Sequence, residues 1–204
     1  MFRAYLDECP LIAIIRGVKP EEAEAIGQTI IDAGIRMIEV PLNSPDPLRS
    51  IERLSARLGD RALVGAGTVL MAEEVPNVRA AGGGIIVSPN TNPEVIAASV
   101  AEGLVSCPGY FTPTEAFTAI AAGATALKLF PAEAATPAVL KAQRAVIPNN
   151  IPIFVVGGIR PDNMREWIDA GADGFGLGGG LYQPGQSAAE TADKARAFVA
   201  GLRG

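Results

Sequence analysis

The sequence predicts an α/β protein in which eight parallel strands alternate with eight helices and close into a (β/α)8 TIM barrel. Three observations predict it: eight short apolar runs, a helix-start signal after most of them, and a small-residue–Gly sequence that recurs about every 20–25 residues. A doubly wound open sheet is the rival architecture, and the even number and regular spacing of the runs favour the barrel. The 204 residues suit one domain over 1–204, with a short helix before the first strand.

The apolar runs have the character of strands that are buried on both faces. They show little alternation of apolar and polar residues, which is typical of a parallel sheet covered by helices. We predict strands at 11–17, 37–42, 62–69, 85–89, 104–109, 126–131, 151–158 and 174–179.

Proline and glycine punctuate the segments between the runs. Proline suits the first helical position, where its missing N–H costs nothing, and we predict it there at Pro20, Pro45, Pro93, Pro113, Pro137 and Pro161. Glycine suits the position after a helix, because it adopts left-handed backbone angles without strain. We predict such helix ends at Gly34, Gly59, Gly82, Gly103, Gly123 and Gly171. Capping boxes are predicted at Thr112–Glu115 and Ser187–Glu190.

The composition excludes several kinds of chemistry. The chain contains no histidine, which excludes a Ser-His-Asp triad and a histidine-ligated zinc site. Its two cysteines, Cys9 and Cys107, provide no disulfide framework and no thiolate cluster, and they suit a reducing cytosol. The net charge of −5 and the lack of a Lys/Arg-rich stretch argue against a nucleic-acid partner. Because no apolar run reaches the roughly 18 residues of a membrane span, and the N-terminal segment is acidic, we expect a cytoplasmic protein without a membrane partner.

Three charged residues lie inside or at the far end of predicted strands, where barrel enzymes place their chemistry. Arg16 ends the first strand, Glu39 lies within the second, and Lys128 lies within the sixth. A charge inside a strand is costly unless it is paired. Each residue alone is compatible with a structural ion pair, but three at one mouth of a barrel indicate a functional site. The charges at strand starts, the end of a barrel associated with stability, are Arg36, Arg61 and Asp173.

Lys128 is the strongest candidate for a nucleophile. Apolar residues flank it on both sides, and burial among them disfavours the charged ammonium. A neighbouring cation such as Arg16 has the same effect, so the pKa of Lys128 should fall from about 10.4 toward neutrality. A neutral amine attacks carbonyl carbons and forms a Schiff base. Glu39 would then carry out the proton transfers for which no histidine exists.

Two glycine-rich segments mark a second part of the predicted site. Gly157 and Gly158 end the seventh strand, and Gly178 and Gly179 belong to the glycine run that ends the eighth. Loops after strands seven and eight of a barrel commonly bind phosphate, because glycine lets backbone N–H groups approach the anion. The alternative is that these glycines only relieve crowding in a narrow barrel. A dinucleotide-binding fingerprint does not fit, because no βαβ unit follows the last strand.

Other polar residues at strand ends are candidates to bind hydroxyl or carboxylate groups: Asn43, Ser44, Thr68, Ser88, Pro89 and Asn90. Thr68 is the best of them, with the alternative that its hydroxyl caps the following helix. We interpret Cys107 as a packing residue, and Trp167 and Tyr182 as surface or packing residues.

Together these segments resemble the KDPG/KHG aldolase family, the class I aldolases of 2-keto-3-deoxy-6-phosphogluconate and -phosphogalactonate. The resemblance runs almost end to end, in order through IAIIRG, IEVPLNSP, VGAGTVL, IVSPN, CPGYFTPTEAFTA, ALKLFPAEA, VVGGIRPDN and GLGGGLYQPGQS. It implies a Schiff-base aldolase that needs neither a metal nor another cofactor. It also implies a homotrimer whose ligands are pyruvate and a phosphorylated keto-deoxy sugar acid.

The resemblance implies roles for individual residues. Lys128 would form the Schiff base, Glu39 would transfer protons, and Arg16 would help hold the pyruvyl carboxylate region. The residues implied to line the substrate pocket are Thr68, Pro89, Phe130 and Val156, and those implied to bind phosphate are Gly157, Gly158, Gly178 and Gly179. The family usually has Ser where this chain has Gly179, so a side-chain hydroxyl is missing there while backbone donors remain.

The choice of sugar acid depends on two positions. The gluconate enzymes are similar to one another in two features: an Arg follows the second strand, and a Thr stands in the place of Val156. This chain has PLNSP and Val156, as in the galactonate enzyme. We therefore expect cleavage of 2-keto-3-deoxy-6-phosphogalactonate to pyruvate and glyceraldehyde 3-phosphate. The alternatives are the gluconate substrate, a sugar-phosphate epimerase or isomerase, and a barrel that binds a phosphosugar without catalysis.

Overall fold

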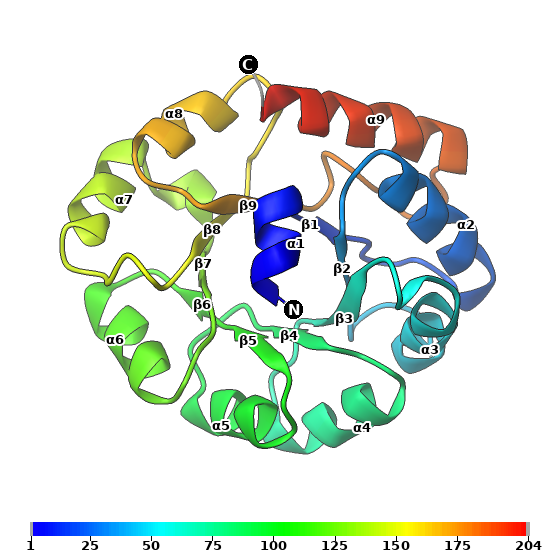
Figure 1. The fold of residues 1–204 in the computed structure, drawn as a ribbon, viewed down its shortest axis with the longest axis horizontal. Coiled ribbons are helices and arrows are strands. Elements are labelled where there is room, and N and C mark those ends of the chain that lie inside the picture. Colours follow the sequence, from blue (N-terminus) through cyan, green and yellow to red (C-terminus); the bar gives the residue numbers. More distant parts are fainter. Residues whose placement is uncertain (1, 203–204) are drawn as a thin grey trace.

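A computed structural model describes residues 2–202; the remaining ends of the predicted domain, Met1 and residues 203–204, lie outside the described part. The described chain forms a ring of parallel strands surrounded by helices, which is the barrel predicted from the sequence (Figure 1). Helix α1 (Phe2–Glu8) lies across one end of the ring, as Figure 1 shows in blue.

The strands form one parallel sheet of nine segments. Their bounds are β1 (Leu11–Ile14), β2 (Met37–Pro41), β3 (Leu63–Gly67), β4 (Ile85–Val87), β5 (Val105–Cys107), β6 (Gly109–Tyr110), β7 (Leu127–Leu129), β8 (Ile153–Val156) and β9 (Gly174–Leu177). Neighbouring strands are hydrogen-bonded in the order β5-β4-β3-β2-β1-β9-β8-β7-β6. All strand residues are buried except Val105, which is partly exposed, as predicted for strands covered on both faces.

The fifth predicted strand, 104–109, is divided into β5 and β6. Pro108 separates them, because it has no N–H to donate and interrupts the ladder. Cys107 of β5 pairs with Val87, whereas Gly109 of β6 pairs with Lys128 on the other side. The two ends of the sheet order are therefore consecutive pieces of one stretch of chain, and this stretch closes the ring. The predicted eight strands are thus present, with one of them in two segments.

At least one helix follows each of the eight strand positions, which confirms the predicted alternation. The helices are α2 (Pro20–Asp32), α3 (Pro47–Leu58), α4 (Val75–Ala80), α5 (Pro93–Ala101), α6 (Pro113–Ala121), α7 (Pro137–Arg144), α8 (Met164–Asp169) and α9 (Ala188–Gly201). Short 3-10 turns, η1 (Ala72–Glu74) and η2 (Ala132–Ala134), precede α4 and α7.

Two predicted helix starts are wrong. Helix α3 begins at Pro47 and not at Pro45, because Asp46 adopts left-handed backbone angles (φ 41°) directly before the helix. Helix α8 begins at Met164 and not at Pro161. There the side chain of Asn163 accepts the Arg160 N–H at 2.9 Å, which holds residues 160–163 in a turn. The other predicted prolines, Pro20, Pro93, Pro113 and Pro137, do begin helices.

Five of the six predicted helix-ending glycines have left-handed φ values, between 69° and 109°: Gly34, Gly82, Gly103, Gly123 and Gly171. Gly59 also directly follows its helix, as predicted, but its φ of −65° is right-handed and its N–H donates to the Ser55 carbonyl at 2.9 Å. The capping box at Thr112–Glu115 is confirmed. At Ser187–Glu190 the structure has the first half of the motif, in which the Ser187 hydroxyl accepts the Glu190 N–H at 3.1 Å.

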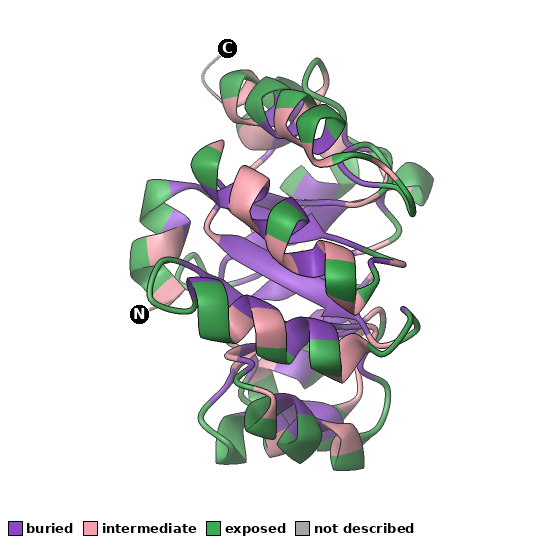
Figure 2. Ribbon diagram, turned by 90° about the vertical axis from the view of Figure 1, so that its right-hand side faces the viewer, coloured by how far each residue is buried: buried purple, intermediate pink, exposed green. Residues whose placement is uncertain are grey.

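The core has two layers, one between the strands and the helices and one inside the ring. Figure 2 shows the buried strands at the centre and the exposed residues on the outer sides of the helices. The inner layer contains Ile12, Ile14, Met37, Leu63, Ile85, Val87, Cys107, Ala126, Phe154 and Val156, with Leu6 of α1 packed below them. The rings of Phe2 and Phe154 lie 6.4 Å apart. Helix α1 therefore closes the N-terminal end of the barrel.

The charges predicted at strand starts form ion pairs around this closed end. Arg36 pairs with Glu8 at 2.7 Å, Arg61 pairs with Asp32 at 3.3 Å, and Asp173 pairs with Arg144. Asp173 also accepts the Ile153 N–H at 2.8 Å, so it links two elements of the barrel. These contacts fit the structural role expected for that end.

Across residues 2–202, no helix is both long enough and apolar enough to cross a membrane.

Gly65 provides a test of the strand spacing. A Cβ at this position would overlap the carbonyl oxygen of Ile85, its partner in β4, and backbone atoms in a ladder cannot move aside. We expect Gly65→Ala to destabilise the fold by about 3 kcal/mol, the upper end of the usual cost of overpacking, because the strand backbone cannot yield. Thermal unfolding followed by circular dichroism should show a melting temperature lower by roughly 6–12 °C.

Gly179→Ala is the matched control, because a Cβ there would meet no atom within 4 Å. Its unfolding should stay within roughly 0.5 kcal/mol of the wild type. Equal melting temperatures for the two variants would contradict the close approach of β3 and β4.

Candidate active site

A cavity of about 530 Å³ opens at the carboxyl ends of the strands, opposite α1. Two of the predicted residues that line it belong to strands, Lys128 of β7 and Val156 of β8, and segments after six strands complete its walls. The lining residues are Ile14, Arg16, Thr68, Pro89, Lys128, Phe130, Glu133, Val156, Gly157, Gly158, Ile159, Arg160, Gly176, Gly178, Gly179, Gly180 and Tyr182. Of the residues to which the family resemblance assigns a role, Glu39 alone is outside this lining, and it is buried within the barrel.

Lys128 lies in an apolar setting at the centre of this end of the barrel. Its side chain is 6% exposed, and its Nζ lies 4.8 Å from the centre of the Phe130 ring. Burial lowers the pKa of Lys128, and nearby Arg16 lowers it further, as the sequence predicts. Glu39 and Cys107 act in the opposite direction, but burial is the largest effect. The amine is therefore deprotonated more readily than an ordinary lysine.

Glu39 of β2 is 1% exposed, and burial raises its pKa to about 7 although Lys128 and Arg16 favour its charged form. Its Oε2 is fully buried and has no hydrogen-bond partner among the described residues. The carboxyl group lies against Gly67 of β3, where any Cβ would overlap it. Glycine at this position thus makes room for the carboxyl group, and a pKa of about 7 suits such a group to proton transfer near neutral pH.

Arg16 is held at the mouth of the cavity. It donates hydrogen bonds to the side chains of Asn43 and, at 3.4 Å, Thr68. Ser44 accepts the Gly17 N–H at 2.9 Å, which joins the loops after β1 and β2. Asn43 therefore orients the guanidinium group and Ser44 holds the neighbouring backbone, and neither residue lines the cavity.

Ser88 and Asn90 do not line the cavity. The Ser88 hydroxyl is buried and donates to the Val69 carbonyl at 2.7 Å, so it connects neighbouring loops. Pro89, between them, does line the cavity. Of this segment, therefore, only the central residue lies at the cavity.

The glycine-rich loops form the other end of the cavity. Gly157 and Gly158 have φ values of 116° and 65°, in the left-handed region that favours glycine. Gly178 and Gly179 lie across from them after β9, and a Cβ on either would meet no atom within 4 Å. These loops leave an open space lined by backbone, which suits an anion.

The comparisons with known proteins agree with this geometry. Residues 2–197 match the family described as KDPG and KHG aldolase. The chain belongs to this family. A 2-dehydro-3-deoxy-6-phosphogalactonate aldolase of Escherichia coli K12 is 50% identical over 95% of each chain, and a probable enzyme of the same name from Rhizobium meliloti is 47% identical over 95% of this chain and 91% of its own.

Solved structures of the aldolase family have the same fold. A native KDPGal structure matches with a TM-score of 0.95 at 50% identity, over 96% of this chain and 95% of its own. A KDPG aldolase from Legionella pneumophila, with pyruvate captured as a covalent carbinolamine intermediate, matches with a TM-score of 0.84 at 26% identity. The latter match covers 96% of this chain and 97% of that structure.

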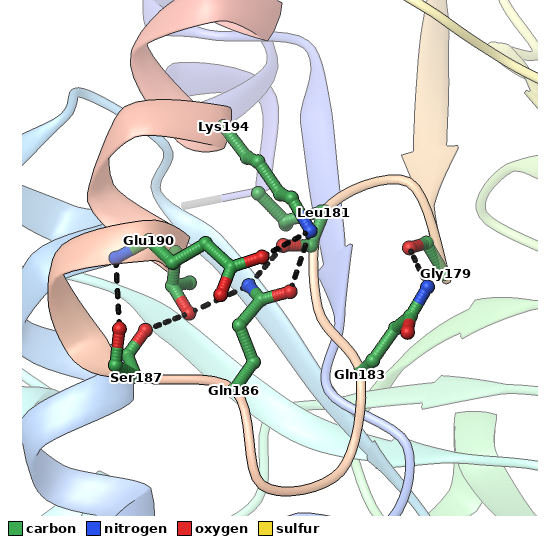
Figure 3. A network of polar contacts seen from close by, with 8 residues as sticks. Gly179, Leu181, Gln183, Gln186, Ser187, Glu190 and Lys194 are labelled. Carbon is green, nitrogen blue, oxygen red and sulfur yellow. Dashed lines mark hydrogen bonds and ion pairs between the residues drawn. The ribbon is translucent and has the colours of Figure 1, made fainter.

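A polar network holds the second glycine loop of this aldolase in place (Figure 3). The Gln186 amide donates to the Leu181 carbonyl at 2.7 Å and to the Thr191 hydroxyl at 2.9 Å. Lys194 of α9 donates to Gln186 at 2.7 Å, and Gln183 donates to the Gly179 carbonyl at 3.3 Å. The loop after β9 is therefore anchored to α9.

The sequence did not single out three residues that line the cavity, Glu133, Arg160 and Tyr182. Tyr182 was expected at the surface or in packing; it is 2% exposed and reaches the cavity wall. Both Glu133, in η2 after β7, and Arg160, in the loop after β8, are exposed. Both residues belong to segments that resemble the family, PAEA and GGIRP, just after strand ends. This position was the feature of the sequence that could have identified them as cavity residues.

Cys107 and Trp167 are buried packing residues, as interpreted from the sequence. Cys107 lies inside the ring, and burial raises the pKa of its thiol to about 12. In the described part of the chain, no three acidic or cysteine side chains gather in a way that could hold a metal ion.

The raised pKa of Glu39 predicts a pH dependence of stability. Between pH 4.5 and 7 the folded carboxyl group keeps a proton that the unfolded chain releases. The folded state therefore binds more protons, and stability should fall by up to about 3 kcal/mol as pH rises through this window. Chemical denaturation of the wild type and Glu39→Gln at both ends of the window measures this loss, which the variant should lack.

Glu21→Gln is the control, because Glu21 is an exposed carboxylate on α2. It should keep the pH dependence of the wild type. A Glu39→Gln variant whose stability falls in parallel with that of the wild type would contradict a protonated, buried Glu39.

Proposed function

We propose that this chain is a class I aldolase that reversibly cleaves 2-dehydro-3-deoxy-6-phosphogalactonate into pyruvate and D-glyceraldehyde 3-phosphate. The observation that carries the proposal is the buried pair of Lys128, with its lowered pKa, and Glu39, with its pKa of about 7. The names of the relatives that are 50% and 47% identical support this substrate. The carbinolamine of the Legionella enzyme supports a covalent route for the family.

The first half of the reaction attaches the substrate to the enzyme. The neutral amine of Lys128 attacks the C2 ketone and forms a carbinolamine. The carbinolamine then loses water, which carries away the ketone oxygen and one proton of the amine. Glu39 gives the proton that this dehydration needs. The product is a protonated imine, which is a far better electron acceptor than the ketone.

The second half breaks the carbon–carbon bond. Glu39, now a carboxylate, takes the proton of the C4 hydroxyl, and the aldehyde forms as the C3–C4 bond breaks. The electron pair of that bond moves into the imine and produces an enamine. Protonation at C3 and addition of water then release pyruvate and restore the amine of Lys128. A pKa of about 7 suits Glu39 to both directions of proton transfer.

The remaining cavity residues orient the substrate in this proposal. Arg16 and Thr68 lie together at the mouth and offer donors to the carboxylate next to C2. Pro89 and Phe130 supply apolar walls around the Schiff base. The backbone groups of Gly157, Gly158, Gly178 and Gly179 bind the phosphate at the opposite end. A homotrimer and a cytoplasmic location stay predictions from the sequence.

Val156 carries the proposed preference at C4. It is 6% exposed at the end of β8, lines the cavity, and offers no hydrogen bond to a C4 hydroxyl. A hydroxyl-bearing residue there would favour the epimer whose C4 oxygen points toward it. A single contact of this kind changes the preference by about 1–3 kcal/mol.

Borohydride reduction in the presence of pyruvate tests the nucleophile. Reduction should trap a pyruvyl adduct on Lys128, located by peptide mass mapping, and Lys128→Met should form no adduct and lose cleavage activity. Lys141→Met is the control, because Lys141 is exposed on α7 and should leave the adduct unchanged. Cleavage should also survive EDTA. An adduct that persists in Lys128→Met, or activity lost with EDTA, would sink the proposed mechanism.

The C4 preference is tested by cleavage of the two epimers. We expect a higher kcat/KM for the galactonate than for the gluconate substrate. Val156→Thr should move the ratio of the two values toward gluconate by roughly tenfold, because it adds a hydroxyl to the cavity lining. Val156→Ala separates the hydroxyl from the change in volume. If Val156→Thr and Val156→Ala change the ratio of the two kcat/KM values equally, a hydroxyl group at position 156 does not distinguish the two substrates.

A further inference from the structure

The ionisable groups of the cavity are divided between its two ends. Arg16 and Lys128 lie at the end where the Schiff base forms. The end formed by the glycine loops is lined by two charged side chains of opposite sign, Glu133 and Arg160. The proposed roles account for the first two residues and leave Glu133 and Arg160 without a function.

Glu133 places a carboxylate directly on the proposed phosphate site. A Cβ on Gly157 would overlap Oε2 of Glu133, and one on Gly158 would lie 3.0 Å from its Cγ. Backbone N–H groups carry only partial charges, whereas a phosphate monoester carries nearly two negative charges at neutral pH. An anion between these loops is therefore repelled by Glu133, and binding needs a compensating cation at the same end.

Arg160 is the cationic side chain that the described structure places there. It follows Gly158 by two residues on the loop after β8, and it lines the same cavity. Its Nε donates to Asp162 at 3.1 Å, and the two side chains are 64% and 77% exposed. Its terminal Nη groups have no hydrogen-bond partner within residues 2–202. Exposed pairs of this kind are weak, so a phosphate can replace Asp162 as the partner of Arg160.

We propose that Arg160 determines the specificity of this site for phosphorylated substrates. Its guanidinium binds the phosphate, and Asp162 is an internal competitor for the same guanidinium. This inference rests on the proposed aldolase function and extends it. It assigns the discrimination between phosphorylated and unphosphorylated compounds to a loop residue rather than to the glycine backbone alone.

The chain offers a matched control for Arg160. Arg165 has the same charge, lies five residues later on α8, and pairs with Asp169 at 2.8 Å. Its exposure, 67%, is close to that of Arg160, but it does not line the cavity. Substitution of either residue by Gln changes the net charge by the same amount. A difference between the two variants therefore reports position and not total charge.

The test uses the aldol addition of pyruvate to two aldehydes, D-glyceraldehyde 3-phosphate and D-glyceraldehyde. We expect Arg160→Gln to raise KM for the phosphorylated aldehyde roughly tenfold, the effect of one hydrogen bond to a charged group. KM for the unphosphorylated aldehyde and kcat for both should stay unchanged. Arg165→Gln should behave as the wild type with both aldehydes.

Asp162→Asn provides a second, opposite readout. Removing the competitor should lower KM for the phosphorylated aldehyde several-fold, and the change should disappear in the double variant with Arg160→Gln. Arg160→Lys should give an intermediate KM, because it keeps the charge and loses the planar fork of donors.

Two results would overturn the inference: equal KM changes of Arg160→Gln for both aldehydes, or equal behaviour of Arg160→Gln and Arg165→Gln. Failure of the proposed function looks different. In that case the wild type forms no pyruvyl adduct and adds pyruvate to neither aldehyde.

Discussion

The structure depends on the burial of a lysine and a glutamate inside one apolar barrel. Lys128 and Glu39 are 6% and 1% exposed, and removal of such groups from water disfavours the charged form of each. Their mutual attraction offsets this only in part, since burial remains the largest influence on both pKa values. Burial therefore raises the pKa of Glu39 to about 7 and lowers that of Lys128, so the two pKa values lie closer together than those of ordinary surface residues.

The closed end of the barrel helps to maintain this burial. The inner layer of apolar side chains and helix α1 cover the pair from below, and Lys128 lines the cavity at the other end. Glycine then creates the space that the charged groups require. Gly67 leaves room for the carboxyl group of Glu39, and Gly157 leaves room for that of Glu133. A Cβ at Gly67 would overlap the buried carboxyl group of Glu39, and a Cβ at Gly157 would displace the exposed carboxyl group of Glu133.

The barrel and the reactive pair were predictable because local rules determine them. Parallel strands covered on both faces are continuous apolar runs, and an interrupting charge such as Glu39 or Lys128 is conspicuous there. Contacts between distant segments were not predictable. Asp46 takes left-handed angles before α3, and Pro108 divides a strand whose two halves pair with different neighbours.

Glu133 and Arg160 belong to this second class. The sequence pattern of a charged residue after a strand does not distinguish a side chain that faces solvent from one that faces a cavity. Only the folded loops place both on the glycine end, with Glu133 against the Gly157–Gly158 backbone. Loop residues are also less constrained by packing than strand residues. The charge balance at the glycine end can therefore change without displacing Lys128, so the proposed phosphate selection and the proposed bond chemistry belong to separate parts of this fold.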